Sequence, residues 1–115
     1  MKIAVTYQNG DVFQHFGHTE QFKIYSVENG KVTDSQVVPT NGSGHGALAG
    51  MLSEWKVDTL ICGGIGAGAQ NALHEAGIKW YGGVSGSADE AVASLLSETL
   101  VYNPNVRCNH HDHEH

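Results

Sequence analysis

The feature that most constrains the fold is a hairpin signal followed by a regular alternation of helix and strand patterns. Asn29-Gly30 separates two runs rich in β-branched residues, Gln21–Glu28 and Lys31–Val38. Both residues of such a turn need positive φ, which Asn and Gly tolerate, so the pair predicts an antiparallel hairpin. After Pro39 the pattern becomes helix, strand, helix, strand, helix. This alternation is typical of parallel strands joined by right-handed crossovers.

The remaining elements follow from local patterns. Strands are expected at Lys2–Tyr7, Val57–Cys62 and Ile78–Tyr81. Three helices are expected because apolar residues recur on one face of each: Ala47, Leu48, Met51, Leu52 and Trp55; Ala69, Ala72, Leu73 and Ala76; Ala88, Val92, Leu95 and Leu96. Gly77 is expected to end the second helix, and a capping box at Ser87-Ala88-Asp89-Glu90 to open the third. We therefore predict an α/β fold with a mixed five-stranded sheet and helices on both faces.

Length and charge limit the function further. The chain has 115 residues, which suits one domain, expected over residues 1–102, with a flexible His-rich tail at 103–115. Six Lys+Arg against twelve Asp+Glu give a net charge of −6, which argues against a nucleic-acid partner. No apolar run approaches the roughly 20 residues of a membrane span. Two cysteines and a start that turns polar early favour a cytoplasmic protein with no membrane partner.

A glycine-rich turn is the first candidate binding element. Cys62 ends a buried strand pattern, and Gly63-Gly64-Ile65-Gly66 leads into the next helix. Glycines allow the backbone to approach a ligand closely, and the first N–H groups of a helix favour anions. The turn matches neither a Walker A loop nor the dinucleotide-binding pattern. A tight packing turn explains the same glycines, so both interpretations stay open.

Histidines in loops form the second candidate element. His15-Phe16-Gly17-His18 follows the first strand, and His45 precedes the first helix. Imidazole is a common ligand of transition metals. Ligands of open α/β sheets bind at the carboxyl ends of the parallel strands, so these histidines and Cys62 are expected near the glycine turn. Solvent-exposed histidines with no ligand are the alternative.

The carboxyl-terminal tail is the third candidate. It carries five potential ligands of divalent transition metals, namely Cys108, His110, His111, His113 and His115. Asp112 and Glu114 interrupt the histidines, which favours a native tail over a purification tag. An acidic tail that binds metal only incidentally is the alternative.

Signs of catalysis are missing from the sequence. There is no Gly-x-Ser-x-Gly elbow, and the acidic residues are scattered over expected surfaces. A Cys62 thiolate at a helix N-terminus acting on phosphorylated or acyl substrates is the remaining enzymatic hypothesis.

Taken together, the ordered motifs resemble the dinitrogenase iron–molybdenum cofactor biosynthesis family of small nitrogenase accessory proteins. The resemblance rests on Met1–Val5, His15-Phe16-Gly17, His45-Gly46, and Val57–Ile61 running into Gly63–Gly66, and covers about residues 1–100. It implies a ribonuclease H-like three-layer fold. It also implies binding of an iron–sulfur or iron–molybdenum cluster or its precursor without turnover. The implied partners are cofactor-biosynthesis or acceptor proteins.

The resemblance also directs attention to particular residues. It strengthens the ligand interpretation of His15 and of the Gly64–Gly66 turn. Family members often carry Arg after the His-Phe-Gly motif, whereas this chain has His18, which removes a fixed charge and adds an imidazole. The predicted cofactor-binding residues are His15, Phe16, Gly17, His18, His45, Cys62, Gly64, Ile65 and Gly66. The alternative function is a transition-metal buffer or sensor that acts through the tail.

Overall fold

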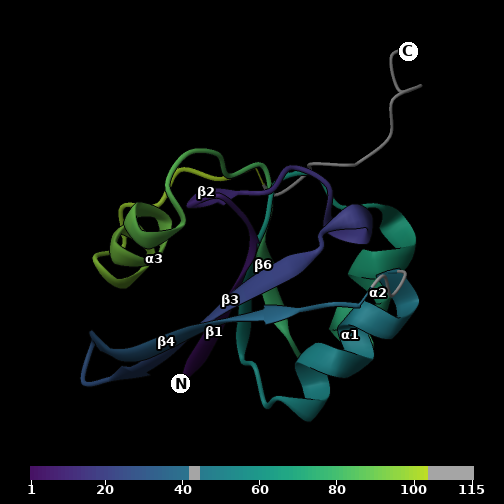
Figure 1. Ribbon diagram of the computed structural model, residues 1–115, viewed down its shortest axis with the longest axis horizontal. Helices are drawn as coiled ribbons and strands as arrows, with labels where there is room; N and C mark the ends of the chain where they lie inside the picture. Colours follow the sequence, from purple (N-terminus) through teal and green to yellow (C-terminus); the bar gives the residue numbers. More distant parts are fainter. Residues whose placement is uncertain (42–44, 104–115) are drawn as a thin grey trace.

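A computed structural model describes residues 1–41 and 45–103, with His45 and Gly46 described only by their backbone. In this part of the chain a mixed sheet lies between two helical layers, with α1 and α2 on one face and α3 on the other (Figure 1). The strands are β1 Lys2–Gln8, β2 Asp11–Val12, β3 Gln21–Glu28, β4 Lys31–Pro39, β5 Thr59–Ile61 and β6 Lys79–Tyr81. The helices are α1 His45–Glu54, α2 Ala67–Glu75 and α3 Ala88–Leu96, with a short 3-10 turn η1 at Phe16–His18.

The strand order in the sheet is β4-β3-β1-β5-β6. β3 and β4 form the predicted antiparallel hairpin, and both turn residues, Asn29 and Gly30, have positive φ. β1 pairs in parallel with β5, and β5 with β6, as the alternation of elements predicts. The three-layer α/β fold with a mixed sheet is therefore confirmed. The sheet also has a sixth strand, β2, which the sequence analysis missed. It pairs with the end of β1 across the Asn9-Gly10 turn.

Alternate residues of the central strands pack into two separate hydrophobic cores, one on each face of the sheet. Ala4 and Leu60 face α1 and α2, in a cluster that includes Phe16, Phe22 and Leu73. Their neighbours face α3, in a cluster that includes Ile3, Val5, Tyr25, Ile61 and Val92. This period of two is what a strand buried on both faces requires. On α1, Ala47 is exposed and Ala49 is buried, so the apolar face of this helix lies slightly away from its predicted position.

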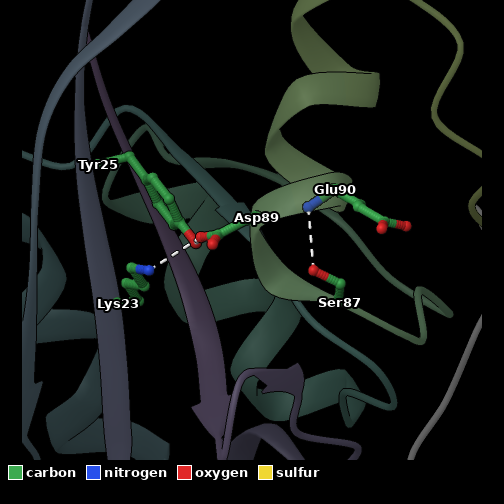
Figure 2. A network of polar contacts seen from close by, with 5 residues as sticks. All are labelled: Lys23, Tyr25, Ser87, Asp89 and Glu90. Atoms are coloured by element: carbon green, nitrogen blue, oxygen red, sulfur yellow. Dashed lines mark hydrogen bonds and ion pairs between the residues drawn. The ribbon is translucent and has the colours of Figure 1, made fainter.

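The helix ends follow their local signals. Gly77 has φ +75° just beyond α2, as the predicted C′ position requires. The Ser87 hydroxyl accepts a hydrogen bond from the Glu90 N–H at 3.2 Å, as expected for the cap of α3 (Figure 2). None of the helices in the described residues combines the length and the apolar character needed to cross a membrane.

A polar network fixes the first turn of α3 to the sheet (Figure 2). The Tyr25 hydroxyl donates to Asp89 Oδ1 at 2.6 Å, and Lys23 Nζ lies 2.9 Å from the same oxygen. These two donors lower the pKa of Asp89, the Tyr25 bond having the larger effect. Burial, and then the bond to Asp89, raises the pKa of Tyr25. The network therefore attaches the first turn of α3 to β3 through the carboxylate of Asp89.

Replacing this carboxylate tests its contribution to stability. We expect Asp89→Asn to lower the free energy of unfolding at pH 7 by about 1 kcal/mol, the usual net value of such a bond. The folded pKa of Asp89 is depressed, so its contribution is present above the ordinary carboxyl pKa of ~3.9 and is lost as the pH falls through the folded value. Urea unfolding between pH 7 and pH 2 measures this. Asp34→Asn, which removes an exposed carboxylate from β4, is the control; a wild-type advantage that persists undiminished at pH 2 would contradict the assignment.

Candidate functional site

Residues 10–16 cross the carboxyl end of the sheet and are bonded to its two sides. Toward α3, the Val12 N–H donates to Gly86 O at 2.8 Å, and the Ala88 N–H donates to Gly10 O at 2.9 Å. Toward β1, the Phe13 N–H donates to Thr6 O at 2.9 Å, and the buried Thr6 hydroxyl donates back to Phe13 O at 2.8 Å. The segment that leads to His15 is thus held in place before His15 is reached.

The next residues pair with the glycine turn after β5. The Gly64 N–H donates to Gln14 O at 2.6 Å, and the Phe16 N–H donates to Gly64 O at 3.0 Å. These two bonds form a parallel bridge between His15 and Gly64, which are 49 positions apart in the sequence. The backbone of His15 therefore lies directly beside the glycine turn, as the carboxyl-end rule predicts.

Glycine is required in this turn for a steric reason. A Cβ placed on Gly63 would lie 2.6 Å from Gln14 Cα and 2.8 Å from the end of the Gln14 side chain. A contact of this length with a backbone atom forces the two segments apart. Gly66 is different, because a Cβ there would meet nothing within 4 Å. The glycine at 63 thus serves close packing of two backbones, which is one of the two roles that the sequence left open.

The start of α2 provides amide donors next to this turn. The Gln70 N–H donates a hydrogen bond to Gly66 O at 3.0 Å. Gly66 is the N-cap residue of α2, and as a glycine it has no side chain that could accept a bond from the first turn. The N–H groups of residues 67–69 precede that bond and have no carbonyl four residues back within the helix. Such amides, with the positive end of the helix dipole, favour an anion.

Two exposed histidines lie on either side of a buried phenylalanine in the segment that meets this turn. Phe16 is completely buried and anchors η1, whereas His15 and His18 on either side of it are exposed. The centroid of the His15 ring lies 6.1 Å from that of Phe13 and 6.4 Å from that of His18. The structure thus brings the rings of His15 and His18 together on the surface, and the backbone of His15 lies next to Gly64.

His45 is placed only by its backbone, which begins α1. The chain just before it is tied to η1, because the Thr40 hydroxyl donates to Thr19 O at 2.9 Å and the Thr40 N–H to Glu20 O at 3.0 Å. η1, α1 and α2 lie together on one side of the molecule (Figure 1). The backbone of His45 is therefore on the side where the site was expected, while participation of its imidazole stays a prediction.

The other predicted residues lie beneath the surface of the site or outside the described chain. Cys62 and Ile65 are fully buried and belong to the same apolar cluster as Phe16. The Cys62 N–H bonds Tyr81 O at 3.0 Å and its carbonyl accepts from Val84 N–H at 3.1 Å, so its backbone joins β6 to the turn. Gly17, Gly64 and Gly66 are half-buried. The tail residues Cys108, His110, His111, His113 and His115 lie outside the described residues.

The described residues hold no preformed set of three metal ligands. Within residues 1–41 and 45–103, no group of three or more His, Cys, Asp or Glu side chains has the geometry of a metal site. His18 also lines a small cavity of about 70 Å³ with Tyr7 and Glu20. The polar groups that the sequence analysis pointed to here are therefore the exposed side chains of His15 and His18 and the first N–H groups of α2.

A separate open groove of about 560 Å³ runs along β6, away from these histidines. Its lining includes Trp80, Tyr81 and Tyr102, with Lys79 and His74 at its sides. It shares no residue with the predicted site. We therefore base the assignment of function on the turn at Gly64.

Comparison with known sequences gives a consistent result. A family model described as dinitrogenase iron-molybdenum cofactor matches residues 1–98. An uncharacterized protein of Methanocaldococcus jannaschii is 30% identical over 106 residues, which cover 87% of this chain and 89% of that protein. The FeMo cofactor biosynthesis protein NifB of Rhizobium leguminosarum bv. trifolii is 32% identical over 109 residues. That match covers 88% of this chain and 22% of NifB, so the chain spans about a fifth of that relative.

Comparison with solved structures supports the same fold. The crystal structure of PH0822 superposes with a TM-score of 0.85 at 22% identity, covering 91% of this chain and 96% of that one. The arrangement of the mixed sheet and its helices is therefore shared with a solved protein.

Two glycine substitutions in the same turn test its geometry. We expect Gly63→Ala to lower the free energy of unfolding by roughly 1–3 kcal/mol, because the new methyl group overlaps the Gln14 backbone. It should also speed hydrogen exchange at the Phe16 N–H, which is bonded to Gly64. Gly66→Ala, where a Cβ meets open space, should change stability by less than about 1 kcal/mol. Equal effects of the two substitutions in urea unfolding and exchange would contradict the close packing.

Proposed function

We propose that this chain, which belongs to the dinitrogenase iron-molybdenum cofactor family, binds and carries an iron–sulfur or iron–molybdenum type cluster or its precursor without chemical turnover. The family is associated with FeMo-cofactor biosynthesis. The observation that carries the proposal is the bridge between His15 and Gly64, which brings the backbone of the exposed His15 beside the turn that leads into α2.

The donors at this place suit such a cluster. Iron–sulfur clusters are anionic and take Cys or His ligands. In this proposal the imidazoles of His15 and His18 are the ligands, and the N–H groups of residues 67–69 donate to the sulfides of the cluster. Phe16, Cys62 and Ile65 are buried in one apolar cluster, and their packing fixes the loop that carries the imidazoles relative to the start of α2.

The small number of donors favours a preassembled cluster over a single ion. A lone divalent ion such as Zn²⁺ usually takes about four ligands. A cluster brings its own sulfides, which already occupy most metal coordination positions, so one or two imidazoles and a few amide donors suffice to hold it. The cluster is thus cargo received from and delivered to other proteins of cofactor biosynthesis.

Exposure of the ligands supports carriage rather than permanent retention. His15 and His18 both reach the solvent, so a cluster bound to them stays accessible to an acceptor protein. An acceptor with stronger ligands can then replace the imidazoles one at a time. This role requires binding and release and no bond chemistry at the protein.

Removal of one imidazole tests the proposal. The protein is treated anaerobically with iron, sulfide and molybdate, and the charge-transfer absorption of the bound cluster is titrated. We expect His15→Ala to weaken binding at least about tenfold, the equivalent of ~1.4 kcal/mol, because a direct ligand is lost. His74→Ala, which removes an exposed histidine of α2, is the matched control and should bind as the wild type does. An unchanged titration of His15→Ala would remove the proposed site.

A second candidate function is a buffer or sensor of transition-metal ions. The density of potential ligands at residues 108–115 favours it, although these residues lie outside the described part of the chain. In this case a divalent metal such as nickel, zinc or cobalt binds to the tail and not at the Gly64 turn.

Truncation separates the two functions. We expect a chain ending at Val106 to lose its uptake of nickel or zinc and to keep its fold, because the described core is built from residues up to Leu100. Metal stoichiometry and the circular dichroism of both chains measure this outcome. Metal stoichiometry that is the same with and without the tail would reject the tail as the binder.

A further inference from the structure

We propose that Gln14 is a positioning residue that holds His15 beside the glycine turn, because it is bonded to the turns that follow both β5 and β6. The proposal rests on the function proposed above, in which His15 is a ligand. Gln14 is adjacent to His15, and its backbone and its side chain are bonded to different segments.

The backbone provides the first attachment. The Gln14 carbonyl accepts the Gly64 N–H at 2.6 Å, and on the other side of His15 the Phe16 N–H returns a bond to Gly64 at 3.0 Å. This pair fixes how far His15 lies along the turn after β5. The Phe13 backbone is held separately by Thr6, so the freedom that remains is a rotation of residues 14 and 15 between these two attachments.

The side chain provides the second attachment. Gln14 Nε2 donates to Val84 O at 3.1 Å, 70 positions away in the sequence, and to Val12 O at 3.0 Å. A primary amide has two N–H groups, so one nitrogen can serve both carbonyls. Val84 belongs to the turn after β6, and the Val84 N–H donates a hydrogen bond to Cys62 O. Gln14 is therefore bonded to both the turn after β5 and the turn after β6, and its side-chain bonds oppose that rotation.

Few residues other than glutamine can meet these requirements. Glutamate has the same length but presents no N–H groups at neutral pH, and asparagine is one methylene shorter. The side chain also lies against Gly63, where a Cβ would approach its amide within 2.8 Å. Gln14 and Gly63 thus fit each other, and both act on the position of His15.

The consequence for the ligand is an ordered imidazole. The centroid of the His15 ring lies 6.1 Å from that of Phe13 and 6.4 Å from that of His18. Because Phe13 stays bonded to Thr6, a rotation of residues 14 and 15 changes the distance between the rings of Phe13 and His15. A ligand that is preorganised in this way loses less conformational freedom when the cluster binds.

Gln14→Met tests this role, since it keeps the length of the side chain and its neutrality and loses both donors. We expect the cluster reconstituted from iron, sulfide and molybdate to bind about three- to tenfold more weakly than to the wild type. In the metal-free protein, the nuclear Overhauser contact between the rings of Phe13 and His15 should weaken. Thr33→Val, which removes a side-chain bond to Ser26 O in the distant hairpin, is the matched control and should change neither.

The outcomes separate this proposal from the one on which it rests. If His15→Ala binds the cluster normally, the proposed function fails, whatever Gln14 does. If His15→Ala loses binding while Gln14→Met keeps both the affinity and the ring contact, only the positioning role fails. Should Gln14→Met not fold, Gln14→Asn provides the test, because its shorter amide cannot span Val12 and Val84 and should lower the affinity as well.

Discussion

The exchange of two backbone hydrogen bonds between Gly64 and residues 14 and 16 is the interaction on which the candidate site depends. It joins the loop that follows β2 to the turn that follows β5, and neither segment belongs to a regular strand at that point. The exchange places the backbone of His15 beside the turn before α2, brings Gly63 against Gln14 and occurs where Phe16 enters the core. A surface loop is thus held by the same kind of backbone bonds as a strand of the sheet.

The two faces of the sheet support this pairing in different ways. On the side of α1 and α2 the support is apolar, because Phe16 packs near Phe22 with ring centroids 6.0 Å apart, within a completely buried cluster. On the side of α3 the support is polar. There the first turn of α3 is bonded both to Gly10 and, through Asp89, to Tyr25 and Lys23 (Figure 2). A displacement of α3 would therefore also shift the backbone of residues 10–16.

The sequence was sufficient wherever structure is decided by neighbouring residues. The Asn29-Gly30 turn, the glycine after α2 and the Ser87 cap each depend on local φ or on a bond three residues away, and all three are found in the structure. The strand β2 was missed although its signal is local. Asn9 and Gly10, both with positive φ, join it to β1 in the same way that Asn29-Gly30 joins β3 to β4. The strand has only two residues, and its further contacts with Gly86 and Ser87 come from about 75 positions away.

The same distinction explains how much of the candidate site was foreseen. A general rule about the carboxyl ends of parallel strands is enough to bring His15 near Gly64. Cys62 was expected among the ligands but is completely buried, because it directly follows β5 and packs into the apolar cluster under α1 and α2. Gln14 was not singled out, since its importance comes from the reach of one amide to Val84, and no pattern of residue types in the sequence marks such a contact.

The division between a rigid base and exposed ligands gives the proposed carrier its physical basis. Tight binding and ready release are opposed if the same groups control both. In the proposed carrier, the orientation of the donors is set by buried groups and by backbone bonds, none of which involves the cluster. The bonds that must break are made by imidazoles at the surface, where an acceptor can approach them. A carrier built in this way keeps the order of its site through each transfer, so the next cluster meets donors that are already in position.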